Sequence, residues 1–233
     1  MPVDPPALLP MKQHPSLRWI GLTGAATALQ VACAATQAPG PVLLVTNDAA
    51  TAARLEEELA FFCAGAVPVY GFPGYETLPY DQFSPHPDII SQRLRTMARL
   101  PALQRGIVIV DLQTALQRLP PRTFIDGHAL SLKAGEALDL EQFRLRLTSA
   151  GYASVPQVGE PGDFAIRGSL FDVFPMGSES PLRIDLFDDV IESIRSFDAE
   201  SQRSLEKLPR LDLLPAREFS LSSDAIKDFR RRF

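Results

Sequence analysis

The hydrophobic pattern of the first half of the chain alternates between continuous apolar runs and helical spacing. Three apolar runs predict strands buried on both faces of a parallel sheet: residues 41–47, 67–70 and 106–111. Two stretches with helical spacing separate them: residues 48–63 and 87–103. This alternation predicts an α/β domain with a doubly wound parallel sheet, which we place at residues 1–127.

The pattern changes after residue 127 to a strand, one helix and several alternating strands. The helix is expected at 138–152, with Gly151 at its C-terminus. These elements predict a smaller α+β domain at residues 128–212, inserted into the first domain. Residues 213–233 either return to domain 1 or begin a connector. Because "SSDAIKDFRRRF" ends in mid-pattern without a C-cap glycine, we expect the chain to be truncated.

The stretch "GLTGAATA" at 21–28 has the glycine spacing with which a phosphate-binding loop begins. It lies between a predicted strand at 18–22 and a predicted helix. Such a loop needs backbone N–H groups, a lysine for the phosphates and a hydroxyl for magnesium. The glycine rhythm is incomplete, since the five loop positions read Gly21, Gly24, Ala26, Thr27 and Ala28. Thr27 stands at the lysine position and Ala28 at the magnesium position, so we expect no ATP hydrolysis. The alternative is a plain glycine turn between a strand and a helix.

Composition narrows the class of protein. The 233 residues are 45% hydrophobic and 22% charged, with a net charge of −5, which argues against a protein that coats nucleic acid. No apolar run reaches the ~20 residues of a membrane span, and the N-terminus lacks the pattern of a signal peptide. We therefore expect a cytoplasmic protein without a membrane partner.

The segment 182–187 predicts a strand with two different faces. One face is apolar and carries Leu182, Ile184 and Leu186. The other carries Arg183, Asp185 and Phe187. Arginine and an aromatic residue on an exposed sheet face are typical of interface hot spots, and a plain solvated face is the alternative. Arg167 precedes Gly168 in a neighbouring segment and is able to join this face.

Other polar clusters are weaker candidates. An acidic group resembles a metal site but fits a hairpin turn better: Asp185, Asp188 and Asp189. A basic helix side could contact nucleic acid or simply solvent: Arg93, Arg95 and Arg99. We expect no metal and no catalytic residue.

Three segments together resemble a known family: residues 21–28, 74–100 and 167–203. The third is the most specific, with "RGSLFDVFPMGSESPLRIDLFDDVIESIRSFDAESQR". Their order resembles the N-terminal module of the bacterial transcription-repair coupling factors, Mfd, which is similar to the first domains of UvrB. Unlike UvrB, the chain has no room after 74–90 for a long damage-probing hairpin.

The resemblance implies the UvrB scaffold without ATP use or damage reading, as an interaction module of transcription-coupled nucleotide excision repair. It implies that domain 2 binds UvrA through Arg167, Arg183 and Phe187. It also implies that further domains of the full-length family protein bind RNA polymerase and DNA and use ATP and magnesium. This chain is therefore expected to need no cofactor. The resemblance places the protein in the cytoplasm, in association with the nucleoid. The alternatives are a nucleotide-binding ATPase half and a DNA-binding domain that uses the arginine helix.

Overall fold

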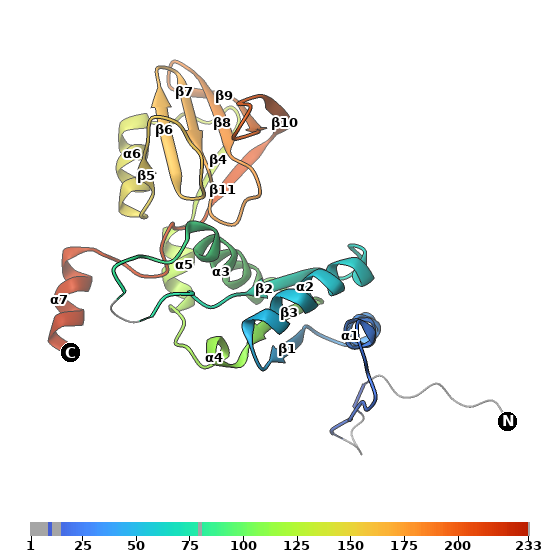
Figure 1. Cartoon of the computed structure of the whole chain (residues 1–233). Coiled ribbons are helices and arrows are strands. Elements are labelled where there is room, and N and C mark those ends of the chain that lie inside the picture. The colour runs from blue at the N-terminus through green and yellow to red at the C-terminus, as the bar shows by residue number, and fades with distance from the viewer. Residues whose placement is uncertain (1–8, 11–14, 79–80, 233) are drawn as a thin grey trace. The chain divides into compact units, whose positions relative to one another are not determined.

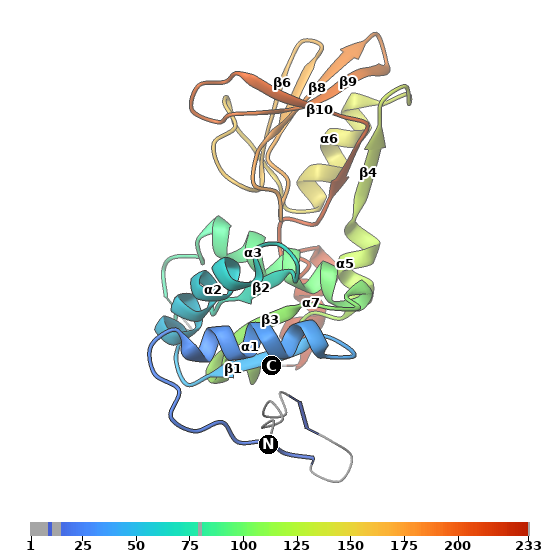
Figure 2. The ribbon, with the colours of Figure 1, turned by 90° about the vertical axis from the view of Figure 1, so that its right-hand side faces the viewer.

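The computed structural model describes residues 9–10, 15–78 and 81–232 and forms two compact units (Figures 1 and 2). Of the described residues, those up to 74 and those from 99 to 117 belong to the first unit, and those from 75 to 98 and from 118 onwards belong to the second. Residues 87–98 of the helix Pro87–Arg99 thus fall in the second unit. Within the described ranges, no helix is long and apolar enough to cross a membrane.

The first unit contains a three-stranded parallel sheet. Its elements are α1 (Ala26–Gln37), β1 (Val42–Thr46), α2 (Ala49–Cys63), β2 (Val69–Phe72), the 3₁₀ helix η1 (Leu100–Ala102), β3 (Ile107–Asp111) and α4 (Leu112–Ala115). The strand order is β1-β3-β2, and every residue of the central β3 is buried. The three predicted strands and their parallel pairing are therefore confirmed. The expected burial on both faces holds for β3 but is wrong for β1, because Leu43 and Val45 are exposed.

Helices α1 and α2 share one hydrophobic core with β1 and β3. Ala28 of α1 and Leu59 of α2 are fully buried in this core. Asp48 caps α2 as expected, because its carboxylate accepts a hydrogen bond from the Thr51 N–H at 2.7 Å. That bond lowers the pKa of Asp48.

The strand predicted at 18–22 is wrong, because these residues form neither strand nor helix. Ile20 is exposed, so it has no apolar burial to stabilise a strand. Gly21 and Gly24 both adopt positive φ, at 77° and 55°, and turn the backbone before α1 begins at Ala26. The glycines therefore form a turn ahead of a helix, without a strand that leads into it.

The second unit is a mixed α/β structure around a six-stranded sheet of order β10-β9-β8-β7-β6-β5, with a separate β11-β4 pair. Its helices are α3 (Pro87–Arg99), α5 (Arg122–His128), α6 (Leu140–Ser149) and α7 (Ser223–Arg232). Its strands are β4 (Leu130–Lys133), β5 (Ala153–Ser154), β6 (Asp163–Arg167), β7 (Leu170–Val173), β8 (Leu182–Phe187), β9 (Val190–Phe197), β10 (Ser204–Leu208) and β11 (Arg210–Leu213). The run from β6 to β9 is an antiparallel meander.

One face of the meander packs on α6. Phe171 of β7 is fully buried, and its ring lies edge-on to Phe143 of α6 with 5.5 Å between centroids. Leu147 is buried on the same helix, as its spacing predicts. Gly151 follows the helix with φ of 97°, a conformation that glycine adopts without strain.

A buried ion pair lies elsewhere in the second unit. Arg93 of α3 has a side chain 0% exposed, and its Nε donates to Glu218 Oε1 at 2.6 Å. Tyr75 donates its hydroxyl to Glu218 Oε2 at 2.8 Å, and its ring lies 4.0 Å from the Arg93 guanidinium. The predicted solvent-facing position of Arg93 is therefore wrong, because this arginine neutralises a carboxylate that lies 125 positions along the chain.

Tyr75 provides a test of this cluster at alkaline pH. Burial and the hydrogen bond to Glu218 raise its pKa to about 12, whereas an unfolded chain ionises tyrosine near about 10. The unfolded state therefore loses its proton first, and the free energy of unfolding should fall as pH rises from about 10 to about 12. In urea titrations over this range, Tyr75→Phe should show a shallower fall than the parent. Burial also raises the pKa of Tyr152, so stability should still fall with pH to some extent in both proteins. Identical slopes of stability against pH in the two proteins would exclude a contribution from Tyr75.

Candidate functional site

The face of the meander opposite α6 carries polar side chains in two adjacent rows, which we call the polar lattice. The strand register places one row of residues side by side across β6 to β9: Ala165, Asp172, Arg183 and Arg195. Lys207 of β10 extends this row. The adjacent row contains Arg167, Leu170, Asp185 and Ser193. Within these two rows, four basic side chains thus stand against two carboxylates.

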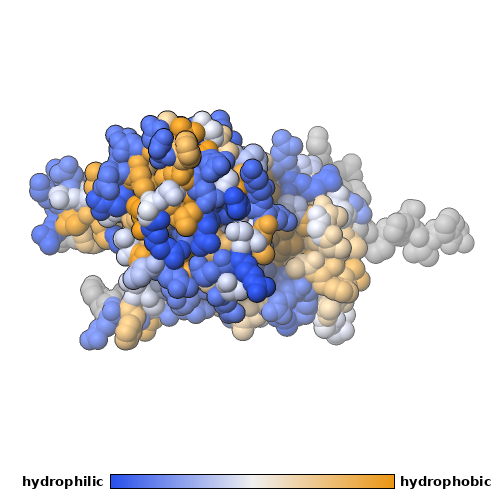
Figure 3. Space-filling model, turned by 90° about the horizontal axis from the view of Figure 1, so that it is seen from above, coloured by the Kyte–Doolittle hydropathy of each residue, from blue (hydrophilic) through white to orange (hydrophobic). Residues whose placement is uncertain are grey.

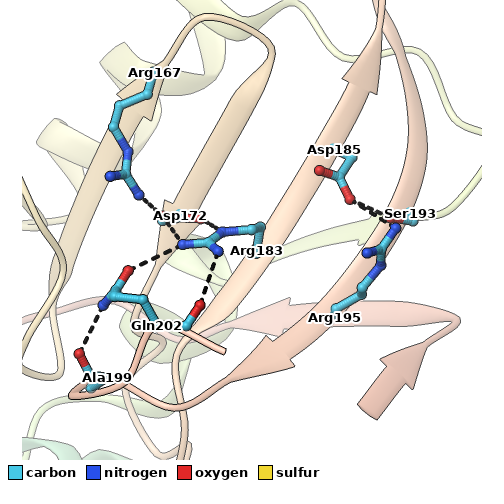
Figure 4. A network of polar contacts seen from close by, with 8 residues as sticks. All are labelled: Arg167, Asp172, Arg183, Asp185, Ser193, Arg195, Ala199 and Gln202. Carbon is cyan, nitrogen blue, oxygen red and sulfur yellow. Dashed lines mark hydrogen bonds and ion pairs between the residues drawn. The ribbon is translucent and has the colours of Figure 1, made fainter. Parts of the chain in front are cut away.

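Asp172 lies at the centre of the lattice and is 1% exposed (Figure 4). Arg183 donates to it through two nitrogens, Nε to Oδ1 at 2.7 Å and Nη2 to Oδ2 at 2.8 Å. Arg167 donates to the same Oδ2 through Nη2 at 2.5 Å. A buried carboxylate is costly without such partners, and here two guanidinium groups satisfy it.

Arg183 is held on three sides, and its side chain is only 17% exposed. Besides Asp172, it donates to the side-chain and backbone oxygens of Gln202 at 3.2 and 3.4 Å. Its guanidinium lies 4.5 Å from the centroid of the Phe197 ring. The hydrogen bond to Asp172 is the main cause of a raised pKa for Arg183, so this side chain stays charged.

A second polar group lies next to the first. Asp185 accepts a hydrogen bond from the Ser193 hydroxyl at 2.6 Å and pairs with Arg195 at 3.3 Å (Figure 4). The Arg195 side chain is 46% exposed, so this pair is more open to solvent than the Asp172 group. Water screens such a pair, and it contributes less to stability than the buried one.

Phe187 ends β8 and is 71% exposed. It pairs with Val190, another exposed apolar residue, across a hairpin whose turn is Asp188-Asp189. Asp188 has φ of 55°, as such a turn requires, so the expected turn is confirmed. The space-filling view from above shows apolar residues among a largely hydrophilic surface (Figure 3). An exposed aromatic side chain is typical of an interface.

Residues 130–219 match the model of the UvrB interaction domain. The transcription-repair-coupling factor of Escherichia coli is 49% identical over 91% of this chain and 18% of its own length. Those of Haemophilus influenzae and Staphylococcus aureus (strain Mu50) are 42% and 32% identical over 89% of the chain and 18% of theirs. The chain is a relative of the transcription-repair-coupling factors. It spans 18% of the length of these relatives.

In this relative of the coupling factors, the three predicted binding residues lie on one sheet in two places. Arg167 and Arg183 come from β6 and β8 and meet on Asp172 of the intervening β7. Phe187 lies four residues beyond Arg183, at the end of β8. The predicted division of that strand into an apolar and a polar face is confirmed by its alternating burial.

The sequence analysis missed two residues that contact the arginines, Asp172 and Gln202. Asp172 is one of several acidic residues in alternating strands, and only the pairing of β7 with both neighbours shows what it contacts. A carboxylate between two arginine-bearing strands is the signal that could have identified it. Gln202 lies in the loop before β10, where it has φ of 59° and its side-chain amide donates to the Ala199 carbonyl at 2.8 Å.

One position of the predicted phosphate loop packs in the core. Ala28, at the magnesium position, is 0% exposed in the core shared by α1 and α2. Ala25 precedes α1 without a side-chain cap. Ala28 thus contributes to the packing of α1 against α2.

Proposed function

We propose that the polar face of β6–β9, with Phe187 at its edge, binds UvrA in transcription-coupled nucleotide excision repair. The observation that supports this most is that Arg167, Arg183 and the exposed Phe187 lie on one sheet within residues 130–219, which match the UvrB interaction domain. Basic side chains of this kind speed encounter with an acidic partner surface and fix its orientation. Phe187 would supply the buried apolar area.

We propose further that this chain acts without catalysis and without a cofactor of its own. Thr27 and Ala28 supply neither the charge nor the magnesium ligand of a phosphate loop, which weighs against an ATPase half. ATP and magnesium, RNA polymerase and DNA would then be bound by parts of the longer relatives that this chain does not span.

The DNA-binding alternative loses its main support. Of the three arginines on α3, Arg93 is buried against Glu218, and Arg95 pairs with Glu179 at 3.1 Å. A row of phosphate contacts along this helix would need exposed basic residues in series. We therefore favour a protein partner over a nucleic acid.

Calorimetry of this chain against UvrA tests the proposal. Phe187→Ala and Arg167→Ala should each weaken binding by about 2 kcal/mol, which is about thirtyfold. Phe61→Ala and Arg144→Ala are matched controls, because these residues are exposed on α2 and α6, and they should leave the affinity unchanged. Loss in the controls as well, or binding that survives both test substitutions, would place the interface elsewhere. A folded parent that does not bind UvrA would refute the proposal.

A further inference from the structure

The two arginines of the proposed interface are not equivalent. Arg183 donates four hydrogen bonds. Nε and Nη2 donate to Asp172, and Nη1 and Nη2 donate to Gln202. A guanidinium has five N–H donors, so these contacts leave at most one for a partner. Arg183 therefore has no free edge with which to clasp a carboxylate of another protein.

Arg167 is in the opposite situation. Its side chain is 47% exposed, and the bond that ties it to Asp172 uses Nη2. The exposed part of the same guanidinium is directed away from the lattice (Figure 4). One anchored nitrogen on a half-exposed arginine restricts its rotamers and leaves donors available to a partner.

We propose that Asp172 is a positioning residue of this interface, which holds Arg167 ready for its partner and fixes Arg183 as an internal support. The inference rests on the proposed function, because it assigns roles within the same surface. Binding is strengthened when side chains are already ordered, since less conformational entropy is lost on association. Asp172 also neutralises one of the two arginine charges. The remaining positive charge lies on Arg167, which is the more exposed of the two arginines.

The polar loop over Arg183 fits this division of roles. Gln202 reaches Arg183 with both its side-chain and backbone oxygens. Asp198 in turn fixes the loop, because its carboxylate accepts hydrogen bonds from both the N–H and the hydroxyl of Ser201 at 2.7 and 2.6 Å. The loop thus covers Arg183 and does not cover the exposed part of Arg167.

A double-mutant cycle measured by calorimetry with UvrA tests the inference. Arg167→Ala should weaken binding about thirtyfold in the parent, and Asp172→Asn alone about tenfold. Once Asp172 is replaced, Arg167 is no longer held, so adding Arg167→Ala should weaken binding by only about threefold more. Asp185→Asn is the control, because it removes another carboxylate of the same face, one that pairs with Arg195. In this background, Arg167→Ala should still weaken binding about thirtyfold.

Effects of Asp172→Asn and Arg167→Ala that simply multiply would overturn the inference, because a residue that only supports the fold would weaken both backgrounds equally. If the parent binds and Asp172→Asn binds as well as the parent, the inference fails while the proposed function stands. If the parent does not bind, the proposed function fails on its own.

Nitrogen-15 NMR of arginine side chains tests the positioning in the parent protein, without UvrA and without a variant that has to fold. Arg167 and Arg183 should show slowed rotation about the Nε–Cζ bond, relative to the exposed Arg146 of α6. Rotation of Arg167 as fast as that of Arg146 would overturn the inference, whatever the calorimetry shows.

Discussion

Replacing Glu218 with alanine is expected to lower the free energy of unfolding by about 3–5 kcal/mol. The change would leave the guanidinium of Arg93 fully buried without the carboxylate that neutralises it. It would also remove the acceptor of the Tyr75 hydroxyl. Urea unfolding followed by circular dichroism measures the loss, which should appear as a lower midpoint at an unchanged slope.

The same helix provides a matched control for this buried pair. Arg95 of α3 pairs with Glu179 at 3.1 Å, but their side chains are 43% and 81% exposed. Glu179→Ala should therefore cost less than about 1 kcal/mol, since water screens the pair and solvates whichever charge remains. Equal losses in Glu218→Ala and Glu179→Ala would show that burial does not govern the strength of the Arg93 pair.

Phe171→Ala is expected to destabilise the protein by about 3–5 kcal/mol. Phe171 is 0% exposed, and its ring contacts those of Phe143 and Phe164 at 5.5 and 6.4 Å between centroids. Truncation would leave a cavity between the sheet and α6, where the surrounding side chains relax only in part. Thermal unfolding measured by calorimetry checks the expected drop.

Phe187→Ala is the natural comparison, because it makes the same chemical change on the opposite face of the sheet. Phe187 is 71% exposed, so its truncation should alter the free energy of unfolding by no more than about 0.5 kcal/mol. The two variants should thus separate stability from binding. A large loss of stability in Phe187→Ala would mean that this ring packs in solution and is not available to a partner.

The sequence predicts those parts of the fold that depend on local pattern. The strands at 42–46 and 107–111 follow from continuous apolar runs, and the two faces of β8 follow from strict alternation. The cap at Asp48 follows from its place before a helical stripe. In each case the residues that decide the structure lie within one element.

What the sequence does not predict depends on contacts between distant segments. Arg93 and Glu218 lie 125 positions apart, and nothing near either residue indicates the other. The sequence likewise places Arg167 and Arg183 in one sheet without revealing that Asp172 holds both. The strand predicted at 18–22 has apolar residues but no packing partner for Ile20, and the short helix α5 occupies a segment that composition assigns to a domain junction.

The pairing order of the strands has a consequence for the time course of folding. In the meander from β6 to β9, each strand pairs with the next one along the chain, so its contacts close short loops. The parallel sheet of the first unit pairs β1 with β3 across the whole intervening segment. Contacts between near neighbours form faster than those across long loops. During synthesis, the strands that carry Arg167, Asp172, Arg183 and Phe187 therefore come together soon after the ribosome releases them.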